Sequence, residues 1–348
     1  MSNQNGVSMN ELPAKLKKLE PSYVSRYWLT ANLLRKLGYK KGMKILDVGG
    51  YGSLLSNFID ARDIWVLDLP DNDDRQYIRA SALNMPLDHG SYDFVVSCDV
   101  YEHIPKKDRE KFVDETLRVA KKFVILCAPF ESQEVKAAEK ATNEYYKKIT
   151  GKEHPWLVEH IANGLPSKKE LREILSKNNL AFDEISHNGV NSWSAIMRNH
   201  FVALTYGRET MEPYLENLYK FYYDNCLLTD FGKHGYRTAY VISKNGDSPA
   251  LEWSTLSNSE DQNTRNHQLL ADYIASNVDQ ELLKVYAGLR ASESLQAELQ
   301  AKVEHLNTEL RNTKSKLSSI YDSKIWRVSK PVRILRRLLV KAKRIISG

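Results

Sequence analysis

The segment that most restricts the fold is an apolar run leading directly into glycines, Met43-Lys-Ile-Leu-Asp-Val-Gly-Gly-Tyr-Gly-Ser53. A parallel strand that turns sharply into a helix leaves backbone N–H groups free at a crevice, and glycines let a ligand approach the backbone closely. The segment therefore predicts a nucleotide-type site at Gly49, Gly50 and Gly52, with a purely structural turn as the alternative. Leu55 replaces the third glycine of a dinucleotide fingerprint, and the Gly-Lys-Ser/Thr of a phosphate loop is missing here.

The surrounding chain alternates short β-branched or aromatic runs with helix-like stretches from Tyr23 to Lys244. This alternation is typical of an α/β domain with a largely parallel, doubly wound sheet. A helix is expected over residues 54–59, directly after the glycines. The predicted strands are Lys44–Val48, Ile64–Asp68, Asp93–Ser97, Phe123–Ala128 and Tyr236–Ser243.

Two acidic residues narrow the ligand class. Asp47 ends the strand before the glycines, where a carboxylate would repel a pyrophosphate but attract a cationic ligand. Asp68 ends the next predicted strand, from which a carboxylate can accept both ribose hydroxyls, and a helix cap or turn is the alternative role. A ligand with a ribose, a positive charge and no phosphate is implied, and S-adenosylmethionine fits that description.

The motif ILDVGGYGS, Asp68 and the stretch ALNMPLDHGSYDFVVSCDVYEHIP together resemble class I S-adenosylmethionine-dependent methyltransferases of the type 11 kind. The resemblance spans roughly Tyr23 to Lys244. It implies a Rossmann-like sheet with an inserted helical lid at about 131–175. Arg26 lies in a helix that in this family closes over the methionine end of the cofactor, with a surface arginine as the alternative. The residues that the resemblance assigns to the cofactor are Arg26, Asp47, Gly49, Gly50, Gly52, Asp68, Leu69, Ser81, Ala82, Leu83 and Asp99.

The sequence departs from the family near the adenine. Where relatives often carry an acidic or amide side chain, this chain has Arg79-Ala-Ser-Ala82. Adenine contacts are therefore expected from the backbone of residues 81–83.

Candidates for the chemistry lie in two places. Asp99, Glu102 and His103 follow the predicted strand Asp93–Ser97 at the mouth of the crevice, and the segment Glu153-His-Pro-Trp-Leu-Val-Glu-His160 lies in the lid. We predict His103, His160 and Asp99 as catalytic residues, with a histidine as general base because neutral imidazole titrates near working pH. Helix capping by Asp99 or Glu102 is the alternative. The predicted acceptor-binding residues are His154, Trp156 and Glu159, with lid packing as their alternative role.

A metal site is a second interpretation of the same residues. Asp-x-x-Glu-His followed by a later histidine is similar to the Glu-x-x-Glu-His metal motif of certain RNA-end and quinone-pathway O-methyltransferases. A divalent ion held by Asp99, Glu102, His103 and either His160 or His154 would lower the pKa of an acceptor hydroxyl. The shorter Asp at the first position distinguishes this chain from that motif.

Residues outside the catalytic domain divide into four parts. Residues 1–20 are polar and basic and predict a flexible arm before a methyltransferase domain at 21–244, and residues 245–266 have the composition of a linker. Apolar residues in a three-four spacing over 267–322 predict a coiled coil with another chain, and a helix folded back on its own domain is the alternative. The seam residues are Leu282, Val285, Leu289, Leu299, Val303, Leu306, Leu310, Leu317 and Ile320.

Charge is concentrated at the C-terminal end. Residues 323–348 carry nine Lys or Arg and no acidic residue, so the rest of the chain is slightly acidic although the whole has a net charge of +6. This part predicts a basic amphipathic helix on an anionic membrane surface, and nucleic acid is not expected as a partner. With three cysteines and no secretory segment at the start, we expect a cytoplasmic protein at the inner face of the membrane.

SKIWRVSKPVRILRRL and EHPWLVEH resemble segments of enzymes and methyltransferases of bacterial surface polysaccharide assembly. The resemblance implies an O-methyltransferase acting on a sugar hydroxyl of a cell-surface polysaccharide or its lipid-linked precursor, with O-antigen as one such glycan. Its implied partners are a glycan or lipid-linked saccharide, a second copy of the chain and polysaccharide-assembly enzymes. A lipid or quinone O-methyltransferase is one alternative. A catalytically degenerate scaffold or chain-length regulator is another.

Overall fold

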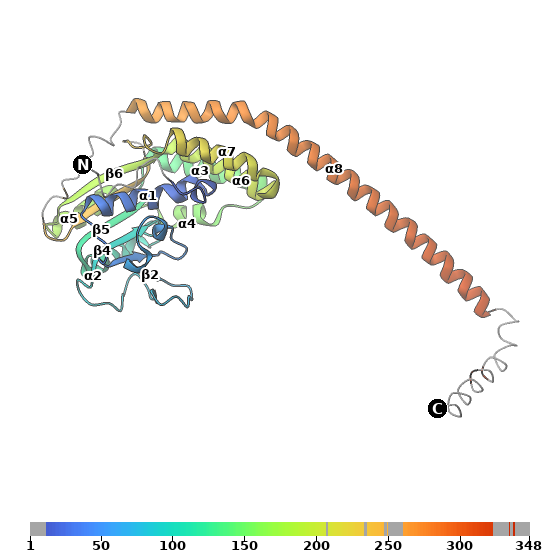
Figure 1. The fold of residues 1–348 in the computed structure, drawn as a ribbon, viewed down its shortest axis with the longest axis horizontal. Helices are drawn as coiled ribbons and strands as arrows, with labels where there is room; N and C mark the ends of the chain where they lie inside the picture. Colours follow the sequence, from blue (N-terminus) through green and yellow to red (C-terminus); the bar gives the residue numbers. More distant parts are fainter. Residues whose placement is uncertain are drawn as a thin grey trace. The chain divides into compact units, whose positions relative to one another are not determined.

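The computed structural model describes residues 12–322 except 207, 233–234, 247–248 and 250–259, and also residues 334 and 337. Its strands form one seven-stranded sheet in the order β3-β2-β1-β4-β5-β7-β6 (Figure 1). Neighbouring strands are parallel, except that β7 runs antiparallel to both β5 and β6. The strands are β1 (Ile45–Val48), β2 (Ile64–Asp68), β3 (Tyr77–Arg79), β4 (Tyr92–Cys98), β5 (Ala120–Pro129), β6 (Phe182–Gly189) and β7 (Gly235–Ser243).

Helices cover both faces of this sheet, as predicted for a doubly wound α/β fold. On one face lies α1 (Pro21–Lys36), where the Thr30 hydroxyl is 3.3 Å from the Cys98 sulfur. Side chains alternate along a strand, so Val95 points to the opposite face. There it packs with residues of α2 (Arg109–Val119) and α5 (Lys168–Lys177).

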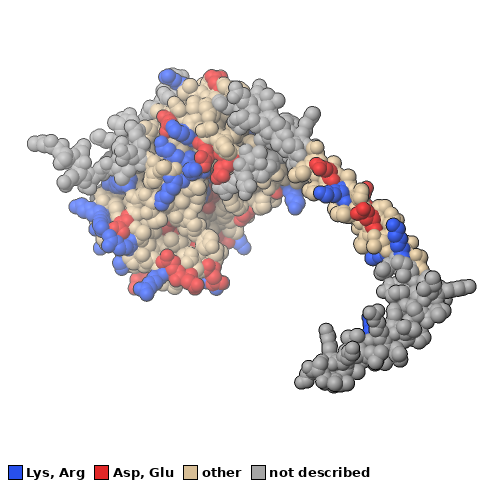
Figure 2. All heavy atoms as spheres, turned by 45° about the vertical axis from the view of Figure 1, so that its right-hand side comes forward, with Lys and Arg blue, Asp and Glu red and all other residues tan. Residues whose placement is uncertain are grey.

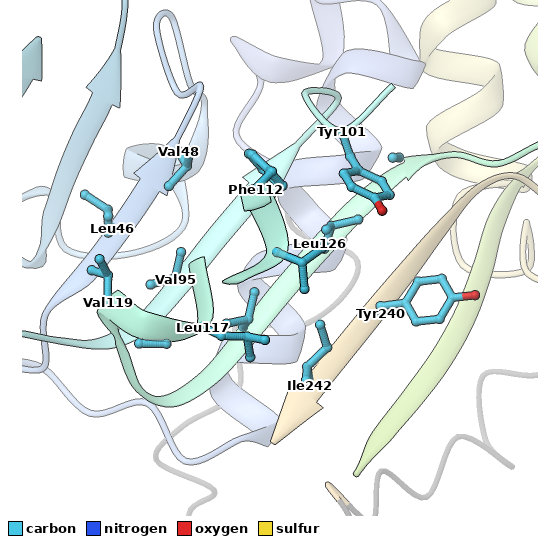
Figure 3. Close-up of a cluster of buried hydrophobic side chains, with 14 of the residues drawn as sticks. Leu46, Val48, Val95, Tyr101, Phe112, Leu117, Val119, Leu126, Tyr240 and Ile242 are labelled. Carbon is cyan, nitrogen blue, oxygen red and sulfur yellow. The ribbon is translucent and has the colours of Figure 1, made fainter. Parts of the chain in front are cut away.

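The main core lies between the sheet and the layer formed by α2 and α5. Figure 3 shows Leu46, Val95 and Leu126 of the strands facing Phe112 and Leu117 of α2. These five side chains are at most 6% exposed. The core therefore fixes β1, β4 and β5 side by side and presents their carboxyl ends at a common edge.

The connection from β1 to β2 is not the helix expected over residues 54–59. It contains only two 3-10 turns, η2 (Leu55–Asn57) and η3 (Ala61–Asp63). The Ser53 hydroxyl accepts a hydrogen bond from the Leu55 N–H at 3.1 Å, and the Asp60 carboxylate accepts one from the Arg62 N–H at 3.1 Å. Such local side-chain bonds satisfy the backbone outside a helix and compete with helix formation.

The helical lid differs in extent from the predicted 131–175. It contains α3 (Gln133–Thr150) and α4 (Pro155–Asn163), whereas α5 belongs to the main core through the fully buried Leu171 and Leu175. A second helical insertion between β6 and β7 was not predicted. It consists of α6 (Val190–Tyr206) and α7 (Arg208–Asn225), and Figure 1 shows α3, α6 and α7 gathered together. Trp193 of α6 packs with Val135 of α3 and Leu157 of α4.

The N-terminal prediction of a flexible arm over residues 1–20 is wrong for its described part, and residues 1–11 lie outside the described residues. Leu12 and Leu16 are buried, and Leu16 begins the short 3-10 helix η1 (Leu16–Lys18). Lys17 forms an ion pair with Asp224 at 3.0 Å. The segment is thus packed against the domain because its two leucines can be buried there.

The last described element is α8 (Glu260–Asp322), which begins inside the predicted linker, so the linker ends before residue 266. The chain divides into two compact units, Met1–Glu281 and Leu282–Gly348. Apart from residues 334 and 337, the predicted basic helix lies outside the described residues, as do the side chains of Leu282, Val285, Leu289, Leu317 and Ile320. On the face drawn in Figure 2, basic and acidic side chains both occur on the sheet-containing unit and along α8.

Candidate active site

The glycine loop begins where β1 ends at the carboxyl edge of the sheet. The Gly49 N–H donates to the Leu67 carbonyl at 2.7 Å, and Gly49 has a φ of +74°. A Cβ added to Gly49 would lie 2.2 Å from Cγ2 of Val100, in the loop after β4. Only glycine fits here, and the close approach places the loop after β4 directly against the glycine loop.

Asp47 lies beneath this loop with 1% exposure. Neither of its carboxylate oxygens has a hydrogen-bond partner among the described residues. Burial raises the pKa of Asp47 to about 7, against smaller opposing effects of Ser53 and Arg26. A Cβ on Gly50 would lie 2.6 Å from the Asp47 carboxyl carbon, so glycine keeps the space above the acid open.

Asp68 ends β2 beside the same loop. Its carboxylate accepts hydrogen bonds from the N–H groups of Tyr51 at 3.0 Å and Leu69 at 2.7 Å. A carboxylate has about four acceptor positions, so two remain for hydroxyl groups. The Leu69 side chain is 65% exposed beside it, and the Ala80 N–H bonds to the Asp68 carbonyl at 3.0 Å.

The predicted adenine contacts follow Ala80 in a turn, where the Ser81 hydroxyl accepts from the Leu83 N–H at 3.2 Å and Ala82 is half-buried. A cavity of about 260 Å³ adjoins the glycine loop and extends along β2. Its lining includes Gly50, Tyr51, Gly52, Ser53, Val66 and Tyr77.

The surroundings of Asp99 do not suit the catalytic role predicted for it. Both of its oxygens are bound by arginines: Arg237 donates to Oδ1 at 2.7 Å and to Oδ2 at 2.5 Å, and Arg26 also donates to Oδ2. Burial would raise the pKa of Asp99, but the two guanidinium groups hold it below its ordinary value. A carboxylate paired in this way is a poor proton acceptor and has no free oxygen for a metal ion. Arg26, for its part, is paired with Asp99 and is not a free surface arginine.

Glu102, His103 and His160 come together, although the first two follow β4 and the third is on α4. One donor atom from each lies within 4.8 Å of the other two. Nδ1 of His103 is 3.1 Å from the Glu159 carboxylate, and Nδ1 of His160 is 2.8 Å from that of Glu139 on α3. Burial and the nearby His160 lower the pKa of His103. We call these three residues, Glu102, His103 and His160, the acid–histidine cluster.

The other lid residues are arranged around this cluster in different ways. His154 is half-buried and stacks on Phe201 with ring centroids 4.8 Å apart, so it contributes to lid packing. Trp156 is 64% exposed and contacts His154 edge-on. The side chain of Glu159 is 46% exposed, and its carboxylate contacts His103.

Three functional-site neighbours were not predicted from the sequence. Arg237 is a single basic residue in the otherwise apolar strand GYRTAYVIS, and that exception was an available signal. Glu139 and Tyr236 had no such signal, because they come from distant segments. The Tyr236 hydroxyl donates to the Glu139 carboxylate at 2.8 Å and so supports the partner of His160.

Comparison with known proteins decides the class. Residues 62–127 match the family model of a methyltransferase domain. The protein is a methyltransferase. Its methyl donor is S-adenosylmethionine. No curated protein sequence matches the chain.

Several solved structures are similar to the methyltransferase at low sequence identity. A protein assigned as a sarcosine dimethylglycine methyltransferase from Galdieria sulphuraria is 17% identical, with a TM-score of 0.42 over 65% of this chain and 87% of that one. A SAM-dependent methyltransferase from Aquifex aeolicus is 14% identical, with a TM-score of 0.33 over 68% and 94%. The magnesium protoporphyrin IX methyltransferase of Synechocystis, solved with bound SAH, is 12% identical, with a TM-score of 0.36 over 67% and 88%.

The residues of the glycine loop fit S-adenosylmethionine. Asp47 is a buried carboxylate without a partner among the described residues, which suits a ligand with positive charge, and Gly50 keeps the space above it clear. Asp68 would hold the ribose hydroxyls through its two remaining acceptor positions. The cofactor supplies a methyl group on a positively charged sulfur, already activated for transfer.

Proposed function

We propose that this methyltransferase transfers its methyl group to a hydroxyl of a sugar in a cell-surface polysaccharide or its lipid-linked precursor. In that reaction the sulfur–carbon bond breaks, a carbon–oxygen bond forms, and the acceptor hydroxyl gives up its proton. The protein must align the acceptor and provide for the departure of that proton.

The observation that carries the proposal is the pair of imidazoles formed by His103 and His160. The rings of His103 and His160 have centroids 5.0 Å apart. The His103 N–H donates to the Val100 carbonyl at 3.0 Å, and Val100 packs against Gly49, so the turn that carries His103 adjoins the glycine loop. A lowered pKa keeps His103 neutral near pH 7, and its Nε2 is then able to accept a proton from a hydroxyl.

The surface of α4 supports a sugar as the acceptor. Trp156 is 64% exposed and lies one helical turn before His160, which faces the interior. The face of an indole ring packs against the apolar face of a sugar ring, which brings a hydroxyl toward the cluster. Ile161 is 63% exposed on another side of the same helix, and this apolar side chain also suits the lipid or quinone alternative.

The deciding experiment is methyl-donor turnover against a panel of glycans, lipid-linked saccharides, quinols and lipids, with mass spectrometry of the products. The expected result is a methylated saccharide, lost in His103→Ala and reduced at least tenfold in Trp156→Ala. His89→Ala, which changes an exposed histidine in the loop before β4, is the matched control. Methylation confined to quinols or lipids would overturn the choice of acceptor.

We further propose that the chain is a homo-oligomer through α8 and that residues 323–348 hold it at the cytoplasmic face of the membrane, beside polysaccharide-assembly enzymes. The support is the concentration of nine basic residues in that segment. Among the described residues, no helix has both the length and the apolar character needed to cross a bilayer. Flotation with phosphatidylglycerol vesicles should require residues 323–348, and equal flotation of the shortened chain would contradict this role.

A further inference from the structure

We infer that Glu102, His103 and His160 form a binding site for a divalent transition-metal ion. The geometry of the cluster supports the binding of an ion, and the catalytic role of that ion rests on the proposed function. One donor atom from each residue lies within 4.8 Å of the others, although the residues come from two separate segments. Nitrogen and oxygen ligands around a tetrahedral zinc ion are about 3.4 Å apart, so side-chain rotations that bring the donor atoms about 1.4 Å closer together would close the site.

Two of these donor groups are buried and unsatisfied. Glu102 is 1% exposed, and its Oε2 has no hydrogen-bond partner among the described residues. His160 is 6% exposed, and its Nε2 also has no hydrogen-bond partner among the described residues. A buried polar atom without a partner destabilises the folded state, and an ion between the two atoms would satisfy both at once.

Both histidines are oriented as metal ligands are. Metal-binding histidines usually donate the other ring N–H to a carboxylate, which fixes the tautomer and the ring orientation. Here Nδ1 of His103 faces Glu159 at 3.1 Å, and Nδ1 of His160 faces Glu139 at 2.8 Å. With Nδ1 protonated, Nε2 of each ring carries the lone pair that a metal ion binds.

The ligand chemistry selects the class of ion. Two imidazoles and one carboxylate suit Zn²⁺, Co²⁺ or Fe²⁺, whereas Mg²⁺ and Ca²⁺ prefer oxygen ligands alone. Asp99, the fourth ligand in the sequence-based alternative, is held by Arg26 and Arg237, so the site has three protein ligands. Three ligands leave a position for the acceptor hydroxyl, whose pKa a bound ion would lower. In that state the imidazoles hold the ion, and the proton of the acceptor hydroxyl passes to solvent water.

The test uses the full chain without a histidine tag, stripped of metal and titrated with Co²⁺ and Zn²⁺ alone by calorimetry and visible absorption. We expect one ion per chain, with visible Co²⁺ bands that indicate nitrogen and oxygen ligation and displacement of Co²⁺ by Zn²⁺. Glu102→Gln, which keeps the side-chain shape, and His103→Ala should each weaken binding at least tenfold. His89→Ala should bind as the unchanged chain does.

Three results would overturn the inference: no binding of Co²⁺, unchanged binding in both cluster variants, or an equal loss in the His89 control. If Glu102→Gln fails to fold, His103→Ala, whose side chain is 29% exposed, keeps the test decisive. Methylation of a saccharide by metal-free enzyme would remove the ion from the reaction and leave the proposed function standing. Tight metal binding without methylation of any saccharide would support the metal site and contradict the proposed function.

Discussion

Nδ1 of His160 lies 2.8 Å from Oε1 of Glu139, and both side chains are less than a tenth exposed. The contact joins α4 to α3 across the lid. The same Glu139 oxygen accepts a hydrogen bond from the Tyr236 hydroxyl at 2.8 Å. A histidine from the lid is thereby fixed in one orientation by groups from two other parts of the chain.

Glu139→Gln tests this positioning role. The amide keeps the shape but weakens the hold on the His160 N–H, so we expect kcat to fall about tenfold with little change in the KM for the cofactor. Glu144→Gln, an exposed residue of the same helix, is the matched control. Steady-state kinetics measures kcat and KM of both variants, and thermal unfolding measures how much of each is folded. A loss of kcat that merely follows a loss of folded protein would count against positioning.

Asp47 predicts a pH-dependent affinity for the cofactor. Its pKa is raised to about 7 by burial in the ligand-free protein, with Arg26 and Asp68 as its charged neighbours. The positive charge of S-adenosylmethionine favours the ionised carboxylate, so binding releases a proton. Affinity should therefore rise with pH up to about 7 and level off above that value. Calorimetry in buffers of different ionisation enthalpy measures the released proton.

The control for this experiment is Asp47→Asn, which cannot ionise. It should bind the cofactor more weakly and with a flat pH profile below neutrality. It should also raise the unfolding temperature at alkaline pH, because a carboxyl with a raised pKa destabilises the folded state once it is ionised. An unchanged profile in Asp47→Asn would assign the pH dependence to another group.

Asp68→Ala tests the ribose contact. We expect the Kd for S-adenosylmethionine to rise at least tenfold, since two hydrogen bonds to a charged acceptor are lost. Asp68→Asn should have a smaller effect because one oxygen remains. Asp71→Ala, nearby on the surface, serves as control. Equal affinity in Asp68→Ala and the unchanged chain would exclude the ribose role.

Arg237→Met tests the buried ion pair. Removing this guanidinium leaves Asp99 with Arg26 alone, so we expect a loss of about 3 kcal/mol in the free energy of unfolding. Arg172→Met is the matched control, because the side chain of Arg172 is 51% exposed in its pair with Glu184. It should cost about 1 kcal/mol or less. Denaturant unfolding compares the two, and similar losses would contradict the structural importance of Arg237.

The sequence predicted the centre of the sheet better than its edges. β1, β2, β4, β5 and β7 were predicted because they are largely buried and therefore apolar. The two missed strands, β3 and β6, are the edge strands, where half-exposed and polar residues leave no clear pattern. The extra helices of the second insertion were also missed, because their packing partners lie far away in the sequence.

The site shows the same division. Gly49 and Asp47 belong to one local motif, from which their roles were predicted. In the structure a side chain at Gly49 would collide with Val100, and the Asp47 carboxylate is buried without a partner among the described residues. The pairing of Asp99, which directly follows β4, with Arg237 of β7 could not be inferred from spacing. Spacing could suggest that His103 and His160 meet, but not which carboxylates would hold them.

The exposed seam of α8 gives the last prediction. Leu299, Val303, Leu306 and Leu310 follow a four-three spacing, and each is more than half exposed in the single chain. Such a stripe is stable in water when a second helix covers it. The double variant Leu306→Asn, Leu310→Asn should therefore convert an oligomer into a monomer in sedimentation experiments. The control variant Ser294→Asn, Thr308→Asn changes exposed residues off the stripe and should leave the oligomer intact. A monomeric unchanged chain at micromolar concentration would contradict the coiled coil, whereas loss of assembly only in the seam variant would identify a second copy as the partner of this face.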